Sequence, residues 1–471
     1  MRPNRQITAC VALALACTFA WAGTPVDSGV LDPTFGSSGK VIVGPSRYTE
    51  AVAQDSVVQQ DGKIVVVGYD SDSVDGFDAW HLERLNANGS IDTSFANAHS
   101  AYVTVGNTGT RAAAVGLQPD GRIVVGGNFN NHILIERYNP DGSFDLTFAG
   151  GTGALSIVPP AGDSNYLSRL VIEANGSIDI AGTYYANPGG FNSNEFYFNK
   201  IAADGSSNQP FQYEFGNGAN QDDHAQDLAI DSQGRYVVVG YHRGASGNYD
   251  FAAIRILSNL YDVDQTFGSG GQTTIDFGDN GDYANAVALT PTGYIALGGQ
   301  ANGQAALALL DPNGNLNTYF SSGLLYSEKF AFAFGTGGGN DTIAKLVLDG
   351  YDTKYPQLLA IGSGNQSYAS GPGGAYGLMF GIARLNLPGT YSNFSLDTGF
   401  NGNGTEGVYF NERPDGIGLL TTTNHGRSAT FANGKLIAAG DTIAPGGTDM
   451  AVARLAPFDG VFKNGFDNPS L

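Results

Sequence analysis

Short apolar runs that end in glycine recur along the chain. Each run is rich in β-branched or other apolar residues, and the seven runs are Lys63–Gly68, Arg122–Gly127, Ser177–Gly182, Arg235–Gly240, Tyr294–Gly299, Gln357–Gly362 and Lys435–Gly440. Their last glycines lie 55–78 residues apart. Runs of this length and composition predict β-strands. Repetition at such a period predicts a solenoid, a propeller or another repeat array.

The first unit contains three further predicted strands around its glycine-ended run. They are Lys40–Val43, Ala51–Val58 and Asp78–Leu85. Asp61-Gly62 separates two of the strands, and Asp-Gly favours the two-residue turn of a β-hairpin. Four short antiparallel strands per unit, repeated seven times, indicate a β-propeller.

A motif that places Asp, or once Asn, three residues before Phe closes the units. Copies occur at Leu31–Gly36, Ile91–Phe95, Phe144–Phe148, Val263–Gly268, Leu316–Phe320 and Leu396–Phe400. Degenerate copies occur at Phe211 and Phe466. The chain therefore has eight copies for seven strand groups, and the extra copy is N-terminal. We expect an all-β fold, a single seven-bladed β-propeller of four-stranded antiparallel blades over about residues 31–466. The N-terminal strand is expected to complete the last blade or to pack against it.

These motifs resemble a known repeat family. The pattern L-D-x-x-F-G at Leu31–Gly36, followed by Q-x-D-G-K-I-V-V-x-G at Gln59–Gly68, is similar to the delta-60 repeat family of bacterial exported proteins. Seven linked copies extend the resemblance over essentially the whole chain after its first residues. The resemblance implies a β-propeller of unknown function, and it brings no catalytic residues with it.

The first 22 residues have the pattern of a signal peptide. Arg2 and Arg5 precede the apolar stretch Ile7–Ala20, and Ala20-Trp21-Ala22 fits the small-x-small cleavage rule. We expect cleavage near Ala22, a mature domain at 23–471 without a transmembrane anchor, and a secreted or periplasmic protein. Both cysteines, Cys10 and Cys17, lie in this segment, so disulfide bonds are not expected to stabilise the mature chain.

Charge excludes some partners. Without the two N-terminal arginines, 44 acidic and 21 basic residues give a net charge near −23. Nucleic acid binding rests on clustered Lys and Arg, so we expect no nucleic acid partner. The chain has no G-x-S-x-G nucleophile elbow and no H-E-x-x-H zinc motif. We expect a monomer that requires no cofactor.

A basic residue recurs before the closing Phe in all units but one. The series is Arg84, Arg137, Lys200, Arg255, Arg384 and Arg454, with Leu309 as the exception. Asp92 and Asp145 lie at a fixed distance from two of these residues, which favours Arg–Asp pairs between neighbouring blades. A charged ring around the propeller axis is the functional alternative, and the structural interpretation is preferred.

Loop lengths vary at only one end of the predicted ring. The long loops are Pro159–Tyr166, Asn217–His224, Phe334–Asp341 and Asn411–Arg427 in one class, and Asp70–Phe77, Tyr184–Asn194, Ser363–Gly377 and Asp441–Thr448 in the other. Both classes emerge at the same end of the sheets, here called the variable rim, and variable loops on a rigid scaffold usually bind ligands. The acidic ligand candidates are Asp70, Asp72, Asp75, Asp222, Asp223, Asp279 and Asp282. Solvated carboxylates that keep the protein soluble are the alternative.

Two metal sites are considered on this rim. Residues 70–76 approach a calcium loop, but Val74 interrupts the required Asp pattern. His224 and His242 are predicted to face each other at the open end of a hairpin, beside Asp222 and Asp223, where they could hold Zn²⁺. An incidental polar rim explains the same residues.

These observations predict an exported binding module with an unknown ligand: an extracellular protein, a glycan or a cation-bearing molecule. The alternative is a propeller hydrolase or lyase that acts through rim carboxylates or the His224/His242 pair. The tail Val461–Asp467 has two interpretations, a sorting tag and a last closing motif. The spacing between Arg454 and Phe466 favours the closing motif, so deletion of residues 462–471 is predicted to lower stability.

Overall fold

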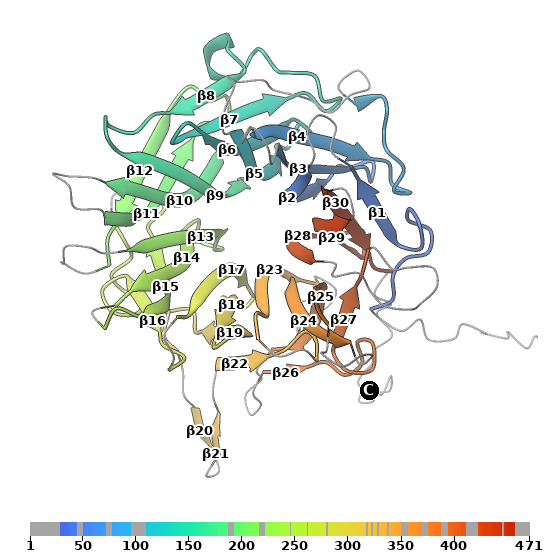
Figure 1. Ribbon diagram of the computed structural model, residues 1–471. Coiled ribbons are helices and arrows are strands. Elements are labelled where there is room, and N and C mark those ends of the chain that lie inside the picture. The colour runs from blue at the N-terminus through green and yellow to red at the C-terminus, as the bar shows by residue number, and fades with distance from the viewer. Residues whose placement is uncertain are drawn as a thin grey trace, which may run out of the picture.

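The protein is a closed ring of seven β-sheets, the blades, around a central axis (Figure 1). The computed structural model describes residues 29–44, 50–71, 78–95, 110–186, 193–215, 222–244, 246–260, 262–278, 281–316, 319–321, 324–326, 329–336, 339–349, 357–368, 375–387, 394–410, 423–444 and 447–456. The predicted signal peptide lies outside these residues. The seven-bladed all-β prediction is confirmed.

Each blade is an antiparallel sheet whose first strand lies next to the axis. From the axis outward, blade 1 contains β2 (Glu50–Val58), β3 (Ile64–Ser71) and β4 (Asp78–Leu85); blade 2 contains β5 (Thr110–Leu117), β6 (Ile123–Phe129), β7 (His132–Tyr138) and β8 (Ala154–Ile157); blade 3 contains β9 (Ser164–Ile172), β10 (Ile178–Ala186), β11 (Ser193–Ile201) and β12 (Asn208–Tyr213); and blade 4 contains β13 (Asp223–Ile230), β14 (Tyr236–Arg243), β15 (Tyr249–Ile256) and β16 (Gln272–Ile275).

The other three blades follow the same order. Blade 5 contains β17 (Tyr283–Leu289), β18 (Ile295–Ala301), β19 (Gln304–Leu310) and β22 (Lys329–Phe332); blade 6 contains β23 (Thr342–Leu348), β24 (Leu358–Tyr368) and β25 (Ala375–Asn386), with β26 (Ser395–Leu396) and β27 (Thr405–Val408) both paired to β25; and blade 7 contains β28 (Asn424–Ala432), β29 (Lys435–Ala444), β30 (Gly447–Arg454) and β1 (Lys40–Val43). The described residues include a 3₁₀ turn at Ala149–Gly151, and no helix among them is long and apolar enough to span a membrane.

The N-terminal strand closes the ring, as predicted. β1 pairs antiparallel with β30, with Lys40 opposite Ala453 and Val43 opposite Met450. Figure 1 shows the blue β1 beside the red β30 at the junction of the two ends. Closure by strands from both ends of the chain leaves no open sheet at the junction, so the ring needs no capping unit.

Both faces of the second strands are buried, which explains why the recurring runs are mainly apolar on both faces. In β3, Val65 and Val67 pack against blade 2, whereas Ile64 and Val66 pack against blade 7. A strand that is covered on both faces needs apolar residues at every position rather than at alternate positions. The seven glycine-ended runs are therefore the inter-blade core of the ring.

The glycine at the end of each run is required by a β-bulge in the neighbouring inner strand. The registers between first and second strands shift at this position in all seven blades, and in blade 4 the shift lies between Ala225 and Asp227. A Cβ atom on Gly240 would lie 1.8 Å from the carbonyl oxygen of His224. Only glycine allows that approach of the two backbones.

The predicted Arg–Asp pairs are confirmed, and each belongs to a three-residue closing unit. In blade 2, Arg137 Nε donates to Asp145 Oδ2 at 2.7 Å, and its guanidinium carbon lies 4.8 Å from the ring centre of the buried Phe148. Arg137 also donates to the carbonyl of Ala203 in blade 3 at 2.7 Å, so the unit ties two blades together. Equivalent units are Arg84–Asp92–Phe95, Arg255–Asp264–Phe267, Arg384–Asp397–Phe400 and Arg454–Asp32–Phe35.

Three closing motifs differ from expectation. Phe211 lies within β12 opposite Phe198, so blade 3 has no closing Phe at that point. Phe320 lies in β20 (Tyr319–Ser321), which pairs with β21 (Leu324–Tyr326) in a hairpin that projects from the ring (Figure 1). Phe466 lies outside the described residues, and the N-terminal Phe35 fills the place next to Arg454.

The predicted two-residue turns are wrong in one detail. Gly62 has φ of +84°, whereas Asp61 keeps a negative φ, and Gly62 N–H donates to the carbonyl of Gln59 at 2.9 Å. The Gln59 N–H closes the loop by donating to the Lys63 carbonyl at 2.8 Å. The hairpin is thus a longer one with a single left-handed glycine, which is the next most common hairpin type.

Candidate functional site

The structure describes four of the seven acidic ligand candidates on the variable rim. Asp72, Asp75 and Asp279 lie outside the described residues. Asp70, Asp223 and Asp282 are fully buried, and only Asp222 is partly exposed. The four described residues therefore have different environments, although the sequence gives them the same appearance.

The buried candidates bond to groups of the protein itself. Asp70 Oδ1 lies 2.5 Å from Nδ1 of the buried His81. Burial alone would lower the pKa of His81, but its hydrogen bond to Asp70 and the Glu83 carboxylate at 3.7 Å raise the pKa to about 9. Asp223 accepts a backbone hydrogen bond from Phe215 at 2.9 Å, and Asp282 accepts one from Phe277 at 2.6 Å. A ligand role for these three carboxylates stays a prediction, and their burial gives each a structural contact.

His224 and His242 do not face each other. In the β13–β14 register, His242 lies opposite Asp223 and His224 lies opposite Tyr241. Neighbouring side chains on a strand point to opposite faces of the sheet, so this one-residue difference separates the two imidazoles. His242 Nδ1 bonds to Asp223 at 2.5 Å, and His224 Nε2 bonds to Asp222 at 2.7 Å. The expected facing pair is wrong, and zinc binding stays a prediction.

Asp222 is the centre of a polar cluster on the rim over blades 3 and 4. It accepts hydrogen bonds from the Tyr249 hydroxyl and the Asn194 amide in addition to the contact with His224. Burial acts to raise the pKa of Asp222, but these hydrogen bonds outweigh it and lower the pKa. The bond to Asp222 raises the pKa of Tyr249 to about 12. At neutral pH Asp222 is therefore a carboxylate that the Tyr249 hydroxyl and the Asn194 amide hold in place.

Three tyrosines and a histidine surround this carboxylate. The Tyr241 ring stacks on His224 at 4.8 Å and meets the Tyr249 and Tyr283 rings edge to face at 5.5 Å and 5.0 Å. Tyr249 and Tyr283 lie 5.3 Å apart. All four rings are partly exposed. We call these four residues together with Asn194 and Asp222 the tyrosine rim.

A group of carboxylates lies next to the tyrosine rim. Asp250, Asp276 and Asp282 bring carboxylate oxygens within 4.8 Å of one another. Burial, and then the charge of Asp276, raise the pKa of Asp250. Calcium prefers oxygen ligands of this kind. Calcium binding stays a prediction, both for this group and for the predicted loop at 70–76, of which residues 72–76 lie outside the described residues.

The tyrosines of this site were not among the residues predicted from the sequence. Tyr241, Tyr249 and Tyr283 each lie at the end or the start of a strand, where a tyrosine is also typical of the half-buried edge of a sheet. The usable signal was their position: three tyrosines at strand ends that all emerge at the variable rim of blades 4 and 5. The predicted His224 and Asp222 do belong to the site.

Comparisons with known proteins agree with the propeller fold. Residues 59–95, 118–148 and 432–466 match a family model described as a domain of unknown function (DUF5122) beta-propeller. The match supports a β-propeller repeat family, and the delta-60 name stays a prediction. A search of curated protein sequences gives no match.

Several solved propeller structures are similar to the chain. An α-L-arabinofuranosidase of Fusarium graminearum has 13% identity and a TM-score of 0.45, over 74% of this chain and 97% of that one. A Trypanosoma rangeli sialidase has 9% identity and a TM-score of 0.37, over 90% of this chain and 60% of that one.

Proposed function

We propose that the protein is an exported binding module that holds a glycan on the tyrosine rim. The supporting observation is the arrangement of four partly exposed rings around the ionised Asp222. Sugar rings present apolar C–H faces that pack on aromatic rings, and their hydroxyl groups bond to carboxylates and amides. The tyrosine rim offers both kinds of contact within one patch.

The scaffold suits binding because it holds these groups rigidly. Asp222 fixes the Tyr249 hydroxyl, the Asn194 amide and the His224 ring through hydrogen bonds, while the rings fix one another by edge contacts. Side chains that are already ordered lose little entropy when a ligand binds. A neutral or cationic glycan fits better than an anionic one because of the Asp222 charge and the acidic group nearby.

The experiment is a glycan array probed with labelled full-length protein, compared with Tyr249→Ala and Tyr283→Ala variants. A ring face that covers on the order of 60 Å² of ligand contributes about 1.5 kcal/mol, so each variant should bind about tenfold more weakly. Tyr294→Ala is the matched control, because Tyr294 is 36% exposed and lies at the opposite end of the ring. Its affinity should equal that of the wild type.

Two results would contradict the proposal. One is a wild-type protein that binds no glycan on the array but captures a defined extracellular protein through the same rim. The other is glycan binding that both tyrosine variants retain in full. Chromatography of the bound glycans after incubation tests the alternative class. Shortened or unsaturated products would favour the hydrolase or lyase.

A further inference from the structure

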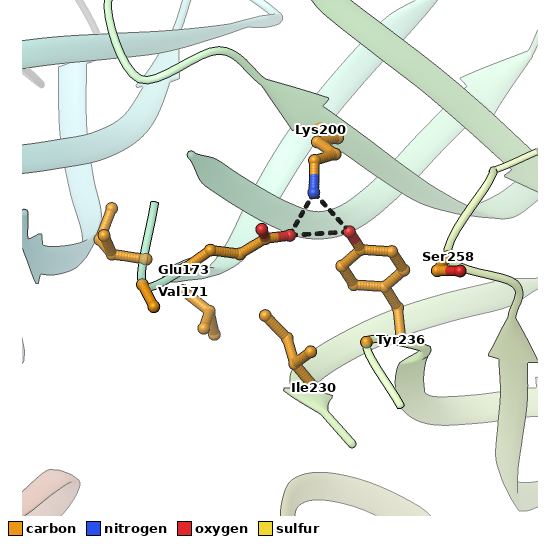
Figure 2. Close-up of a pocket in the computed structure, with 9 residues that line it drawn as sticks. Val171, Glu173, Lys200, Ile230, Tyr236 and Ser258 are labelled. Atoms are coloured by element: carbon orange, nitrogen blue, oxygen red, sulfur yellow. Dashed lines mark hydrogen bonds and ion pairs between the residues drawn. The ribbon is translucent and has the colours of Figure 1, made fainter. Parts of the chain in front are cut away.

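The junctions of blade 3 with blade 4 and of blade 5 with blade 6 lack the closing unit that the other five junctions use. Lys200 stands at the arginine position, and blade 3 has no closing Phe and Asp of its own. Instead, Lys200 Nζ donates to the Tyr236 hydroxyl at 2.6 Å and lies 5.3 Å from the centre of that ring. Lys200 also pairs with Glu173, and the Tyr236 hydroxyl donates to Glu173 at 2.8 Å. A cation, an aromatic ring and a carboxylate are thus assembled again from different places in the chain (Figure 2).

This replacement leaves a pocket at the face opposite the variable rim. Its volume is about 560 Å³, which is within the usual range for small-molecule sites. Its polar lining is Glu173, Lys200, Tyr236 and Ser258, and Val171 and Ile230 belong to its apolar wall. Figure 2 shows the three hydrogen-bonded side chains together at one side of the pocket.

A buried carboxyl group lies behind the pocket. It is not needed to join the two blades, so it indicates a further role for this site. Asp179 lies directly opposite Lys200 in the β10–β11 register and is fully buried. Among the described residues no N–H group and no hydroxyl group bonds to either of its carboxylate oxygens, and its carboxyl group lies against that of Glu173. The six other blades have buried apolar residues at this position, namely Val65, Val124, Val237, Ala296, Leu359 and Ile437.

This carboxylate is costly for folding. A buried carboxyl group that meets a second carboxyl group, and no basic group, destabilises a protein, and violations of a local rule of this kind concentrate at functional sites. Burial, and then the charge of Glu173, raise the pKa of Asp179 to about 8. Burial also acts on Glu173, but the hydrogen bonds from Lys200 and Tyr236 lower its pKa. At neutral pH the pair therefore holds one proton, on Asp179, and one negative charge, on Glu173.

The charges decide the class of ligand. The positive charge of Lys200 is balanced by the negative charge of Glu173. A neutral ligand therefore keeps every charge in the pocket paired. An anion would be repelled by Glu173, and a cation would be repelled by Lys200. Either ion would also lose its hydration without gaining a free counter-charge in the pocket. The ammonium group has three N–H donors, of which Glu173 and Tyr236 take two. One donor beside an acceptor matches adjacent hydroxyl groups, of which one accepts from Lys200 and the other donates to Glu173.

We propose that the pocket between blades 3 and 4 binds a small neutral polyhydroxylated molecule, such as a single sugar unit or a polyol. Glu173, Lys200, Tyr236 and Ser258 would contact its hydroxyl groups, and Val171 and Ile230 would pack against its C–H face. Asp179 is a positioning residue that lies behind Glu173 and Lys200. The site is separate from the tyrosine rim, and the inference stands without the proposed function.

The test is saturation-transfer NMR of the full chain with free neutral hexoses, pentoses and alditols, followed by calorimetry on each molecule that binds. The deciding variant is E173Q/K200R, because it installs the pair found in blades 1 and 2, where Gln59 accepts from Arg84 and Gln118 accepts from Arg137. It should keep the wild-type melting temperature and bind at least about tenfold more weakly, owing to the changed charge contacts.

Two further variants keep the test decisive. Asp179→Val restores the apolar residue of the other blades, and it should raise the melting temperature while it weakens binding. If E173Q/K200R does not fold, Ser258→Trp at the exposed edge of the pocket should block binding in a folded protein. Tyr249→Ala should leave binding in this pocket unchanged. The outcome for the pocket is therefore independent of the outcome for glycan binding on the tyrosine rim. The proposal is overturned if no neutral sugar or polyol binds, if sugar acids bind better, or if binding survives in the folded E173Q/K200R and Ser258→Trp variants.

Discussion

Arg169 Nε donates to Asp227 Oδ1 at 2.8 Å, and this bond joins the inner strands of blades 3 and 4 at the axis of the ring. Arg169 also reaches Asp55 of blade 1 at 3.0 Å, and Lys345 of blade 6 reaches Asp227 at 3.1 Å. The four side chains are largely buried and follow the β-bulges of their strands. Two positive and two negative charges thus connect four of the seven blades.

This network should stabilise the ring strongly. Asp227→Asn leaves Lys345 and Arg169 without their shared carboxylate, and the loss of one partner of a buried ion pair costs about 3–5 kcal/mol. Denaturant unfolding at pH 7 would measure the change. Asp61→Asn is the control, since Asp61 is exposed and should change the free energy of unfolding by about 0.5 kcal/mol or less. Equal effects of the two substitutions would contradict the network.

The same network predicts a direction for acid unfolding. Burial acts to raise the pKa of Asp227, but the charges of Lys345 and Arg169 outweigh it and lower the pKa below its ordinary value of 3.8. A lowered folded pKa means that the stabilisation is present above pH 3.8 and is lost as the pH falls through the folded pKa. The wild type should therefore lose more stability than Asp227→Asn between pH 5 and pH 2.

Phe148 should be among the most sensitive positions of the closing units. Its ring is fully buried beneath Arg137 and next to Gly205 of blade 3, so Phe148→Ala should cost about 3–5 kcal/mol. Leu146→Ala is a close control, because Leu146 is two residues away and 64% exposed. It should change the melting temperature little. A Phe148→Ala melting temperature within error of the wild type would mean that the ring adds nothing to the junction.

The buried His81–Asp70 pair predicts a loss of stability at alkaline pH. The folded pKa of His81 is about 9, above its ordinary value of 6.5, so its contribution is complete below pH 6.5 and is lost as the pH rises through 9. A shift of this size corresponds to about 3 kcal/mol. Stability should therefore fall between pH 6.5 and pH 9.5, and an Asp70→Asn/His81→Gln variant should show a smaller fall. Parallel pH profiles of the two proteins would refute the charged pair.

The fold was predictable because its requirements are repeated in the sequence. Gly240 and its six counterparts occur wherever an inner-strand carbonyl comes too close for a Cβ atom, and Phe148 and its counterparts occur at five of the seven junctions between blades. Seven repetitions of one backbone constraint are readable without knowledge of distances. The predicted Arg–Asp pairs followed from a similar regularity, since Asp lies eight residues after Arg in blades 1 and 2 and nine residues after it in blade 4.

The candidate sites were less predictable because they depend on contacts between units. Tyr236 takes the place of a closing Phe that belongs to the preceding blade, so no spacing within one unit relates it to Lys200. The register of His224 was wrong by one residue because strand boundaries do not show where pairing begins. Asp179 could have been found, since alignment of the seven runs shows one acidic residue in an otherwise apolar column.

The two ends of the chain give the last prediction. Sequence spacing favoured Phe466 as the closing residue after Arg454, but Arg454 stacks on the buried Phe35 at 4.4 Å and pairs with Asp32 at 3.0 Å. The single closing position of blade 7 is thus filled from the N-terminus. Phe35→Ala should therefore destabilise the protein by about 3–5 kcal/mol. Deletion of residues 462–471 should leave the melting temperature unchanged, contrary to the expectation from spacing. Thermal unfolding of the two variants beside the wild type decides the matter, because a truncation as damaging as Phe35→Ala would show that the tail also packs on the ring.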